Sequence, residues 1–442
     1  MLSTEERIIA RESLQMALDA GAQKARVSLS KNTMNLIATL DAQIDKITSC
    51  LDRSISLNLY VDGRYGSFST NKLERASLKD FIGKAVATTR MLAEDRCRDL
   101  PDGSRTVKDA VDGNELGITD PAFAGVDDSF RSRTATENAL QITEGDGWKL
   151  VSQEGEYSDS EYWNLVLDSN GLEALHGETS FEFFTELTIE DAHGNKYSGG
   201  WWEAAPLLKD FHPEKVAQAA LQEAVMQIGP KRCRSGKYKL VIDSEVSSKV
   251  VSPILNALNA FNIQQGNSFL KDTAGRQVFP AGLNIMDIPR TKGEPCGKLF
   301  DSEGVATSNH AIIENGVVKE YFVNTYMANK LGIAPTAEDA IRPMVMPFAA
   351  TGREDIMQLC GDGILVTDFC GGNCNIATGA FSYAIQGYRF KNGRTVHPVR
   401  EMLITGDILS LWSRLIAAGS DARRCRAKLT PTLAFDAVDF SG

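Results

Sequence analysis

The nine residues FEFFTELTI at positions 181–189 decide the class of fold. Phe181, Phe183, Thr185, Leu187 and Ile189 alternate with the other residues of this stretch. A period of two puts the first set on one face of a β-strand, where it can pack against a core. The stretch therefore predicts a strand that belongs to a sheet with a buried face.

Neighbouring stretches predict further strands joined by tight turns. Residues Tyr162–Asp168 lead to Asn170-Gly171, and the alternating residues 55–59 lead to Asp62-Gly63. Asn-Gly and Asp-Gly suit the two-residue turns of β-hairpins, because both central positions need a positive φ. We expect a multi-stranded antiparallel sheet in the first half of the chain.

Helices are predicted from capping signals and from apolar residues at helical spacing. Ser3 and Glu6 form a capping box at the start of the first helix. Residues 100–127 are rich in Pro, Gly and Asp and predict a long loop. The other predicted helices begin near Ser77 and cover Ser129–Ile142, Pro213–Ile228, Ser247–Phe261 and Leu409–Ala418.

The chain has 442 residues, which suggests two or three domains. Gly229-Pro230 follows a predicted helix and precedes a basic run, as expected at a domain boundary. We expect an N-terminal α/β domain at residues 1–215 and a mainly β domain at residues 230–442. In the second domain, strand Tyr238–Ile242 is followed by predicted hairpin turns at Asn315-Gly316 and Asn392-Gly393.

Composition limits the possible partners. The formal net charge of −11 argues against a basic face that neutralises nucleic-acid phosphates. The first residues lack the basic and apolar regions of a signal peptide. No stretch reaches the roughly 18 apolar residues that span a bilayer. We expect a cytoplasmic protein without direct nucleic-acid or membrane contacts.

The residue pattern offers no local metal site. The five histidines are far apart in sequence, so no helix can present two imidazoles to one ion. Cys370 and Cys374 could begin a metal site, but no second Cys or His pair completes it. Either thiol could act as a nucleophile if a base and an oxyanion hole lie nearby. We assign no catalytic residue, no metal ligand and no bound cofactor.

Two segments of the second half are unusual. Phe300–Thr307 reads FDSEGVAT and leads into a predicted strand, and Gly371–Ser382 reads GGNCNIATGAFS. Glycine-rich backbone lets another chain approach closely. A capped hairpin for the first segment and a mobile loop for the second are the plain structural interpretations.

These segments resemble the TldD/PmbA family, also called the modulator of DNA gyrase family. FDSEG is similar to the Asp-x-Glu-Gly signature of that family, and Asn375–Ser382 is similar to the matching loop of its PmbA (TldE) branch. The similarity covers essentially the whole chain and is strongest from about 295 to 440. Further matching segments are Val399–Gly406, Ala418–Asp421, Thr430–Leu433 and, more loosely, Tyr60–Ser67.

The resemblance implies an α+β protein. It would have an N-terminal α/β domain with an antiparallel sheet and helices, and a C-terminal, largely β, barrel-like domain. It also implies a cytoplasmic proteolytic machine that processes or degrades peptides and unfolded chains. In the TldD branch, a His-Glu-x-x-x-His helix supplies the metal site. By order along the chain, the corresponding helix here is Ser247–Phe261, which contains no His and no Glu.

This departure is typical of the TldE/PmbA branch. We therefore expect a subunit that is not catalytic alone and pairs with a TldD-type homologue, or forms a homodimer by itself. Zinc is expected only in the partner. The alternatives are an autonomous hydrolase with a Cys nucleophile and a regulatory binding protein of DNA gyrase. The substrate-contacting residues implied by the resemblance are Asp301, Glu303, Gly304, Asn375, Thr378 and Gly379.

Overall fold

The computed structural model describes residues 1–442, and the chain forms two compact units. Residues 290–307 and 328–333 belong to unit 1, although they follow the first part of unit 2 in sequence. The order of residues along the chain does not indicate that these two segments return to unit 1. Unit 1 comprises Met1–Val225, Arg290–Thr307 and Ala328–Ile333, and unit 2 comprises Met226–Pro289, Ser308–Met327 and Ala334–Gly442.

Unit 1 is built on a seven-stranded sheet with the order β3-β2-β1-β5-β6-β7, and β4 pairs with β5. All pairs are antiparallel, which confirms the predicted sheet. The strands are β1 Lys24–Leu40, β2 Gln43–Val61, β3 Arg64–Thr70, β4 Glu144–Gly145, β5 Trp148–Asp168, β6 Glu173–Asp191 and β7 Lys196–Ala205.

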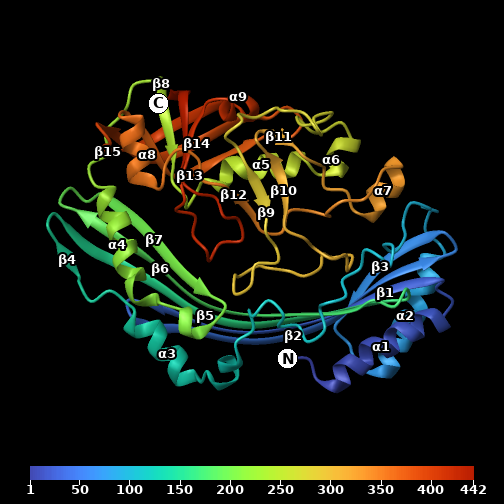
Figure 1. The fold of residues 1–442 in the computed structure, drawn as a ribbon. Coiled ribbons are helices and arrows are strands. Elements are labelled where there is room, and N and C mark those ends of the chain that lie inside the picture. The colour runs from blue at the N-terminus through green and yellow to red at the C-terminus, as the bar shows by residue number, and fades with distance from the viewer. The chain divides into compact units, whose positions relative to one another are not determined.

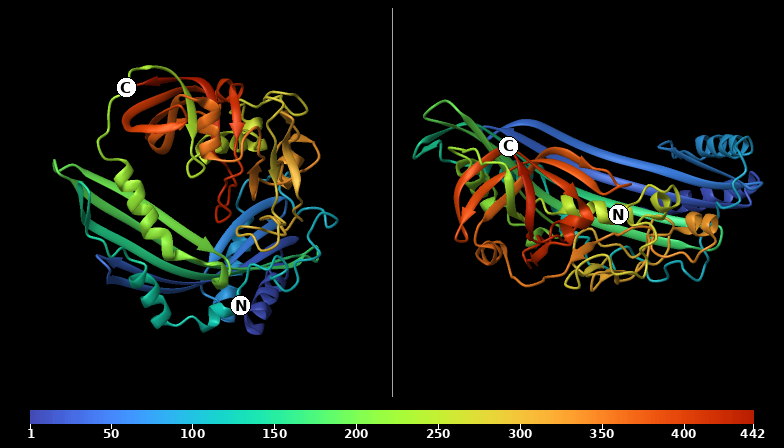
Figure 2. Two further views of the ribbon diagram at one scale, coloured as in Figure 1. Left: turned by 60° about the vertical axis from the view of Figure 1, so that its left-hand side comes forward. Right: turned by 90° about the horizontal axis from the view of Figure 1, so that it is seen from above.

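Four of these strands are much longer than the short alternating stretches that predicted them. β5 has 21 residues and β2 has 19. At about 3.3 Å per residue, each spans roughly 60 Å or more. The resulting sheet curves along its length, as Figures 1 and 2 show in blue and green.

The helices of unit 1 cover the face of the sheet that carries the odd-numbered residues of β5. Leu165 lies in one core cluster with residues of α1 and α2. Tyr157 lies in another cluster with Ala135 of α3 and Val216 of α4. Because side chains alternate along a strand, Leu165 and Tyr157 point to the same face. The helices are α1 Thr4–Asp19, α2 Arg75–Thr89, α3 Asp128–Glu137 and α4 Val216–Met226.

Local signals that were read from sequence are present at the predicted places. The Glu6 N–H donates to Ser3 Oγ at 3.1 Å, and the Ser3 N–H donates to Glu6 Oε2 at 2.7 Å, which confirms the capping box. Residues 100–127 form the expected connection, interrupted by a short 3-10 turn at Pro121–Gly125. Helix α3 is shorter than predicted, since it ends at Glu137 with Asn138 as its cap.

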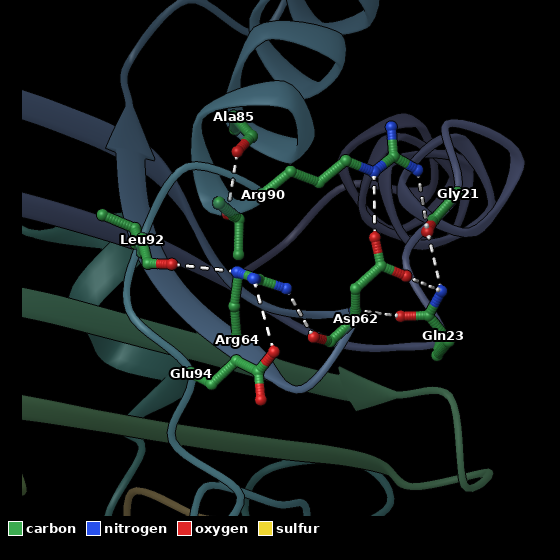
Figure 3. A network of polar contacts seen from close by, with 9 residues as sticks. Gly21, Gln23, Asp62, Arg64, Ala85, Arg90, Leu92 and Glu94 are labelled. Carbon is green, nitrogen blue, oxygen red and sulfur yellow. Dashed lines mark hydrogen bonds and ion pairs between the residues drawn. The ribbon is translucent and has the colours of Figure 1, made fainter.

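The β2–β3 hairpin turns at Asp62 and Gly63, whose φ angles of 51° and 73° fit the predicted turn. A polar network ties this turn to its surroundings (Figure 3). The Asp62 N–H donates to Gln23 Oε1 at 2.7 Å, and the Arg90 guanidinium lies 3.4 Å from the Asp62 carboxylate. Arg64 donates to the carbonyl oxygen of Asp62 at 2.8 Å. The turn is therefore held by side chains from the start of β1, from β3 and from the end of α2.

Unit 2 contains a six-stranded sheet with the order β15-β14-β13-β8-β17-β16. β15 also pairs with β17, so five of these strands close into a barrel. The closure confirms the barrel-like C-terminal domain. The barrel strands are β8 Gly236–Ile242, β13 Gly363–Cys374, β14 Ala380–Lys391, β15 Arg394–Asp407 and β17 Leu433–Ser441, with β16 Leu415–Ala418 beside them.

A smaller four-stranded sheet and five helices complete the second half of the chain. The smaller sheet has the order β11-β10-β9-β12. Its strands are β9 Ile285–Asp287, β10 His310–Glu314, β11 Val317–Val318 and β12 Pro343–Val345. The helices are α5 Ser248–Ala257, α6 Ala260–Gln264, α7 Thr325–Leu331, α8 Arg353–Cys360 and α9 Ile408–Trp412. None of the helices in the chain is long and apolar enough to cross a bilayer.

Two helix predictions in this half need correction. The predicted helix Leu409–Ala418 is helical only to Trp412, and Leu415–Ala418 forms β16 against β17. A short apolar run does not reveal its type by periodicity, and pairing with β17 decided it here. The predicted helix Ser247–Phe261 is interrupted at Asn259, whose side chain accepts the Phe261 N–H at 3.0 Å and starts α6.

Candidate functional site

The acidic segment Phe300–Thr307 forms a tight loop in unit 1. The Asp301 carboxylate accepts the backbone N–H groups of Glu303 at 2.9 Å and Val305 at 3.0 Å. Gly304 has a φ of +83°, and a Cβ at this position would overlap Leu172 Cδ2. Asp301 and Gly304 therefore shape the loop, because one supplies acceptors to its backbone and the other allows its conformation.

The same segment is anchored by apolar packing on the face of the sheet that carries the even-numbered residues of β5. Phe300 lies in a buried cluster with Val166 of β5 and Val107 of the long connection. Its ring meets the His176 imidazole edge-on, with the centroids 6.4 Å apart. Glu303 is buried, and its charge adds to the effect of burial in raising the pKa of Tyr60.

His176 pairs with Glu178, the carboxylate that follows it two residues later. Their Nε2 and Oε2 atoms are 3.6 Å apart. Burial acts to raise the pKa of Glu178, but the nearby His176 imidazole outweighs burial and the pKa is lowered. This polar contact lies beside Phe300 and is not a set of metal ligands, which needs at least a third donor.

The glycine-rich segment forms the end of β13, a hydrogen-bonded turn and the start of β14. The Gly379 N–H donates to the Asn375 carbonyl at 2.7 Å, and the Asn375 side chain accepts the Ala377 N–H at 2.9 Å. Thr378 Oγ1 accepts the Ala380 N–H at 3.2 Å. Gly379 has a φ of +78°. Asn375 and Thr378 reach the surface, so their remaining hydrogen-bonding capacity faces solvent.

A hollow of about 500 Å³ opens beside α5 in unit 2. One wall is α5 with the residues before it, and the other comes from β13, β14 and the turn between them. The hollow therefore joins the helix and the glycine-rich segment that the sequence singled out separately. Its lining residues are Glu245, Val246, Ser248, Lys249, Ser252, Pro253, Asn256, Asp368, Phe369, Asn373, Cys374, Ile376 and Tyr383.

The charges around this hollow are unequally paired. Glu245 accepts from Arg423 at 3.0 Å and also from Arg426, so its carboxylate is neutralised locally. Lys249 Nζ lies 5.2 Å from the centroid of the Tyr383 ring, a cation–π contact, and has no carboxylate partner in the chain. Asp368 accepts from Gln386 at 3.2 Å. The hollow can bind a polar chain, and Lys249 supplies a positive charge that no carboxylate neutralises.

The two thiols of this region are poorly set up as nucleophiles. Burial raises the pKa of Cys370, and the neighbouring Asp368 carboxylate raises it further. Burial also raises the pKa of Cys374, whose sulfur lies 3.6 Å from the Gly379 carbonyl. A reactive cysteine needs the opposite shift, since the thiolate is the nucleophile.

The residues of α5 do not fit a metal. Its polar side chains toward the hollow are Ser248, Lys249, Ser252 and Asn256, and a lysine ammonium repels a cation. In the whole chain, no group of three or more His, Cys, Asp or Glu side chains is arranged to hold a metal ion. A zinc site needs three or four such ligands.

The predicted substrate-contacting residues belong to two different units. Asp301, Glu303 and Gly304 lie in unit 1, whereas Asn375, Thr378 and Gly379 lie in unit 2. Lys249 and Tyr383, which define the hollow, were not singled out from sequence. Nothing in the neighbouring sequence marks Lys249, in the first turn of a helix, or Tyr383, on an alternating strand, as part of a binding site. Only folding brings the two residues to the same hollow.

Two protein-family models match large parts of this chain. The family model of the PmbA/TldA metallopeptidase C-terminal domain matches residues 235–442, and that of the central domain matches residues 126–228. The two matches show that this chain is similar to the metallopeptidases that these models describe. The chain belongs to the PmbA/TldD family.

The sequences of individual relatives align with nearly the full length of this chain. Metalloprotease PmbA of Escherichia coli O157:H7 is 24% identical over 441 residues, covering 97% of this chain and 96% of the relative. The PmbA homologue of Haemophilus influenzae is 25% identical over 436 residues, covering 97% and 94%.

Solved structures share the fold. A crystal structure from Bacteroides thetaiotaomicron, named "putative modulator of DNA gyrase", has a TM-score of 0.95 and 34% identity, with both chains fully covered. TldE from Thermococcus kodakarensis has a TM-score of 0.82 at 15% identity, covering 98% of this chain and 100% of that one, and it shows the fold alone.

Proposed function

We propose that this chain is the PmbA/TldE-like subunit of a cytoplasmic TldD-type metallopeptidase that processes or degrades peptides and unfolded chains. In this proposal it pairs with a TldD-type homologue and contributes substrate contacts but no metal ligand. The observation that carries the proposal is the composition of α5. This helix presents Ser248, Lys249, Ser252 and Asn256 to the hollow, where the metal-bearing branch is expected to carry two His and a Glu.

The physical reason is the chemistry of the ligands. Zinc in a peptidase polarises the scissile carbonyl and activates a water molecule, and it needs neutral imidazoles or carboxylates as direct ligands. Serine, asparagine and a protonated lysine supply neither the donor strength nor the negative charge. The chemistry would therefore belong to the homologue, which would supply the zinc.

The role left to this chain is binding. Lys249 can attract a carboxylate of an extended peptide, and Asn375 and Thr378 offer polar groups that reach the surface at the glycine-rich turn. The proposal also keeps the predicted contacts of Asp301, Glu303 and Gly304. Main-chain hydrogen bonds to exposed strands are a common way of holding extended peptides.

The test measures metal content and cleavage of an unfolded peptide, for this chain, for its TldD-type homologue and for the mixture. We expect stoichiometric zinc and cleavage only when the homologue is present. Replacing the metal-binding His residues of the homologue should abolish activity of the mixture, and Lys249→Ala in this chain should raise KM without removing zinc. Stoichiometric zinc and cleavage by this chain alone would overturn the proposal.

The alternative of a cysteine hydrolase is not supported by the surroundings of the two thiols. Burial raises the pKa of both Cys370 and Cys374, which disfavours the thiolate that a cysteine hydrolase uses as its nucleophile. The link to gyrase rests on the name given to a related structure, and the net charge of −11 offers no general attraction to DNA.

A further inference from the structure

The strand β2 has a long free edge. β3 pairs with β2 only along Ile55–Val61, whereas β1 pairs with β2 along its whole length. Residues 43–54 therefore have a neighbouring strand on one side and none on the other. Such an edge exposes a row of backbone N–H and C=O groups that can pair with another strand.

The side chains of this edge are exposed and unusually apolar for an unpaired strand. Ile47 is 66% exposed and Leu51 is 55% exposed. They lie four residues apart and so point to the same face of the sheet. Asp45 and Lys46 have no charged partner within the chain. Edges that avoid association usually place charges and bulges where these two apolar side chains lie.

The sequence of the edge is complementary to itself in one antiparallel register. When a two-fold axis passes through Ser49, unlike charges face each other and apolar residues face apolar residues. A two-fold interface contains each pair of unlike residues twice. The pairs are Lys46 with Asp52, Ile47 with Leu51, Thr48 with Cys50, and Ser49 with its own copy.

Adjacent registers lose this match. The neighbouring two-fold registers have the axis through Thr48 or through Cys50, because residues opposite each other in an antiparallel pair point to the same face. With the axis through Thr48, Asp45 faces Leu51, and with the axis through Cys50, Ile47 faces Arg53, so neither register keeps a pair of unlike charges or a pair of apolar residues. The axis through Ser49 is therefore favoured over both neighbours.

The length of the free edge agrees with the same register. It is limited by the start of β3 pairing at Ile55 on one side and by the β1–β2 turn before Gln43 on the other. Pairing centred on Ser49 uses Ile44–Ser54. The central pairs lie clear of the bulge in β2 at Asp45, where the register with β1 shifts. Arg53 lies 3.4 Å from Glu6 and is partly engaged already.

We propose that the β2 edge Ile44–Ser54 pairs with the same segment of a second copy of this chain, joining two unit 1 sheets into one continuous antiparallel sheet. The interface goes beyond the proposed peptidase role and needs no residue of α5. A failure of the zinc and cleavage experiment would therefore leave it standing, and its own failure would leave the peptidase role untouched.

The first test is disulfide cross-linking on the axis. In the full chain with Cys50→Ser, the added substitution Ser49→Cys places two thiols opposite each other at a Cα separation of about 4.5–5.5 Å. This separation lies within the range that a disulfide can bridge. Mild oxidation with diamide should give a covalent dimer that thiol reduction reverses.

The matched control is Ile44→Cys with Cys50→Ser on the same edge. Residue 44 lies five positions from the axis, so its two copies are roughly 30 Å apart and should not cross-link. The Cys50→Ser parent, oxidised in parallel, reports any link through the remaining cysteines.

The second test reverses the charges. Lys46→Glu alone and Asp52→Lys alone should each weaken dimerisation roughly tenfold in sedimentation experiments, because each places like charges in two symmetric pairs. The combination of both should restore dimerisation, since it exchanges the two charges. Neither substitution should change the folded state, because both side chains lie on an exposed edge.

Three results would overturn the interface. The chain could remain monomeric at every concentration. It could dimerise while the Ser49→Cys variant fails to cross-link. The Ser49→Cys variant could cross-link only to a TldD-type homologue and never to itself, which would make the occupant a different chain.

Discussion

Substituting Gly304 by Ala tests whether the acidic segment is held by its backbone conformation and by its contact with Leu172. An alanine in the left-handed region costs about 1–2 kcal/mol. The new Cβ would overlap Leu172 Cδ2, and overpacking of this kind costs about 1–3 kcal/mol. We therefore expect Gly304→Ala to destabilise the segment by about 2–5 kcal/mol.

The control is Gly293→Ala, which lies in the same excursion of the chain. Gly293 has a φ of +71°, but nothing lies within 4 Å of the position that its Cβ would take. It should therefore lose only the conformational part, about 1–2 kcal/mol. The difference between the two variants isolates the overlap with Leu172.

The double variant Gly304→Ala/Leu172→Ala gives a second check. Leu172→Ala alone removes a buried side chain and should cost about 2–5 kcal/mol. With Leu172 truncated the overlap disappears, so the double variant should lose about 1–3 kcal/mol less than the sum of the single variants.

Hydrogen exchange of peptides covering residues 299–307 is the appropriate assay, because a chain of two units need not unfold in one step. Two outcomes would refute the reasoning. One is a Gly304→Ala effect no larger than that of Gly293→Ala. The other is full additivity in the double variant.

Three further predictions concern charged groups. Asp159→Ala should destabilise unit 1 by about 3–5 kcal/mol in urea unfolding, because it leaves the buried Arg131, which donates to Asp159 at 2.7 Å, without its carboxylate partner. Replacing both residues, as Arg131→Met with Asp159→Leu, should cost less, because no buried charge is then left unpaired. The pKa of Asp191 is lowered from 3.8 to about 2 by hydrogen bonds to its carboxylate, so its contribution to stability is complete above pH 4 and is lost as the pH falls toward 2. The hydrogen-exchange protection of residues 191–197 should fall over the same pH range. In an Asp191→Ala variant this protection should not change over that range. Asp368→Asn should lower the pKa of Cys370 and speed its alkylation by iodoacetamide at pH 8, and an unchanged rate would contradict the assigned contact.

The candidate site shows where prediction from sequence stops. The absence of His and Glu from Ser247–Phe261 is visible in the printed residues, and so is the glycine-rich segment. Their shared hollow is not, because more than a hundred residues separate Lys249 from Tyr383 and no spacing rule connects them. The Asp301 carboxylate was expected to contact substrate, a role that stays a prediction. In the structure it accepts two backbone N–H groups, an engagement that sequence could not reveal.

Sequence by itself determined the local features of this protein: the Ser3 capping box, the Asp62-Gly63 turn and the alternation that makes Phe181–Ile189 a strand. These depend on interactions between residues a few positions apart, so their physical cause lies within the stretch itself. Tertiary structure alone decided the length of β2 and β5, the closure of the barrel by β15 and β17, the strand at Leu415–Ala418 and the return of residues 290–307 to unit 1. Each of these depends on which distant segment supplies the hydrogen-bonding or apolar partner, and that choice is made only when the whole chain packs.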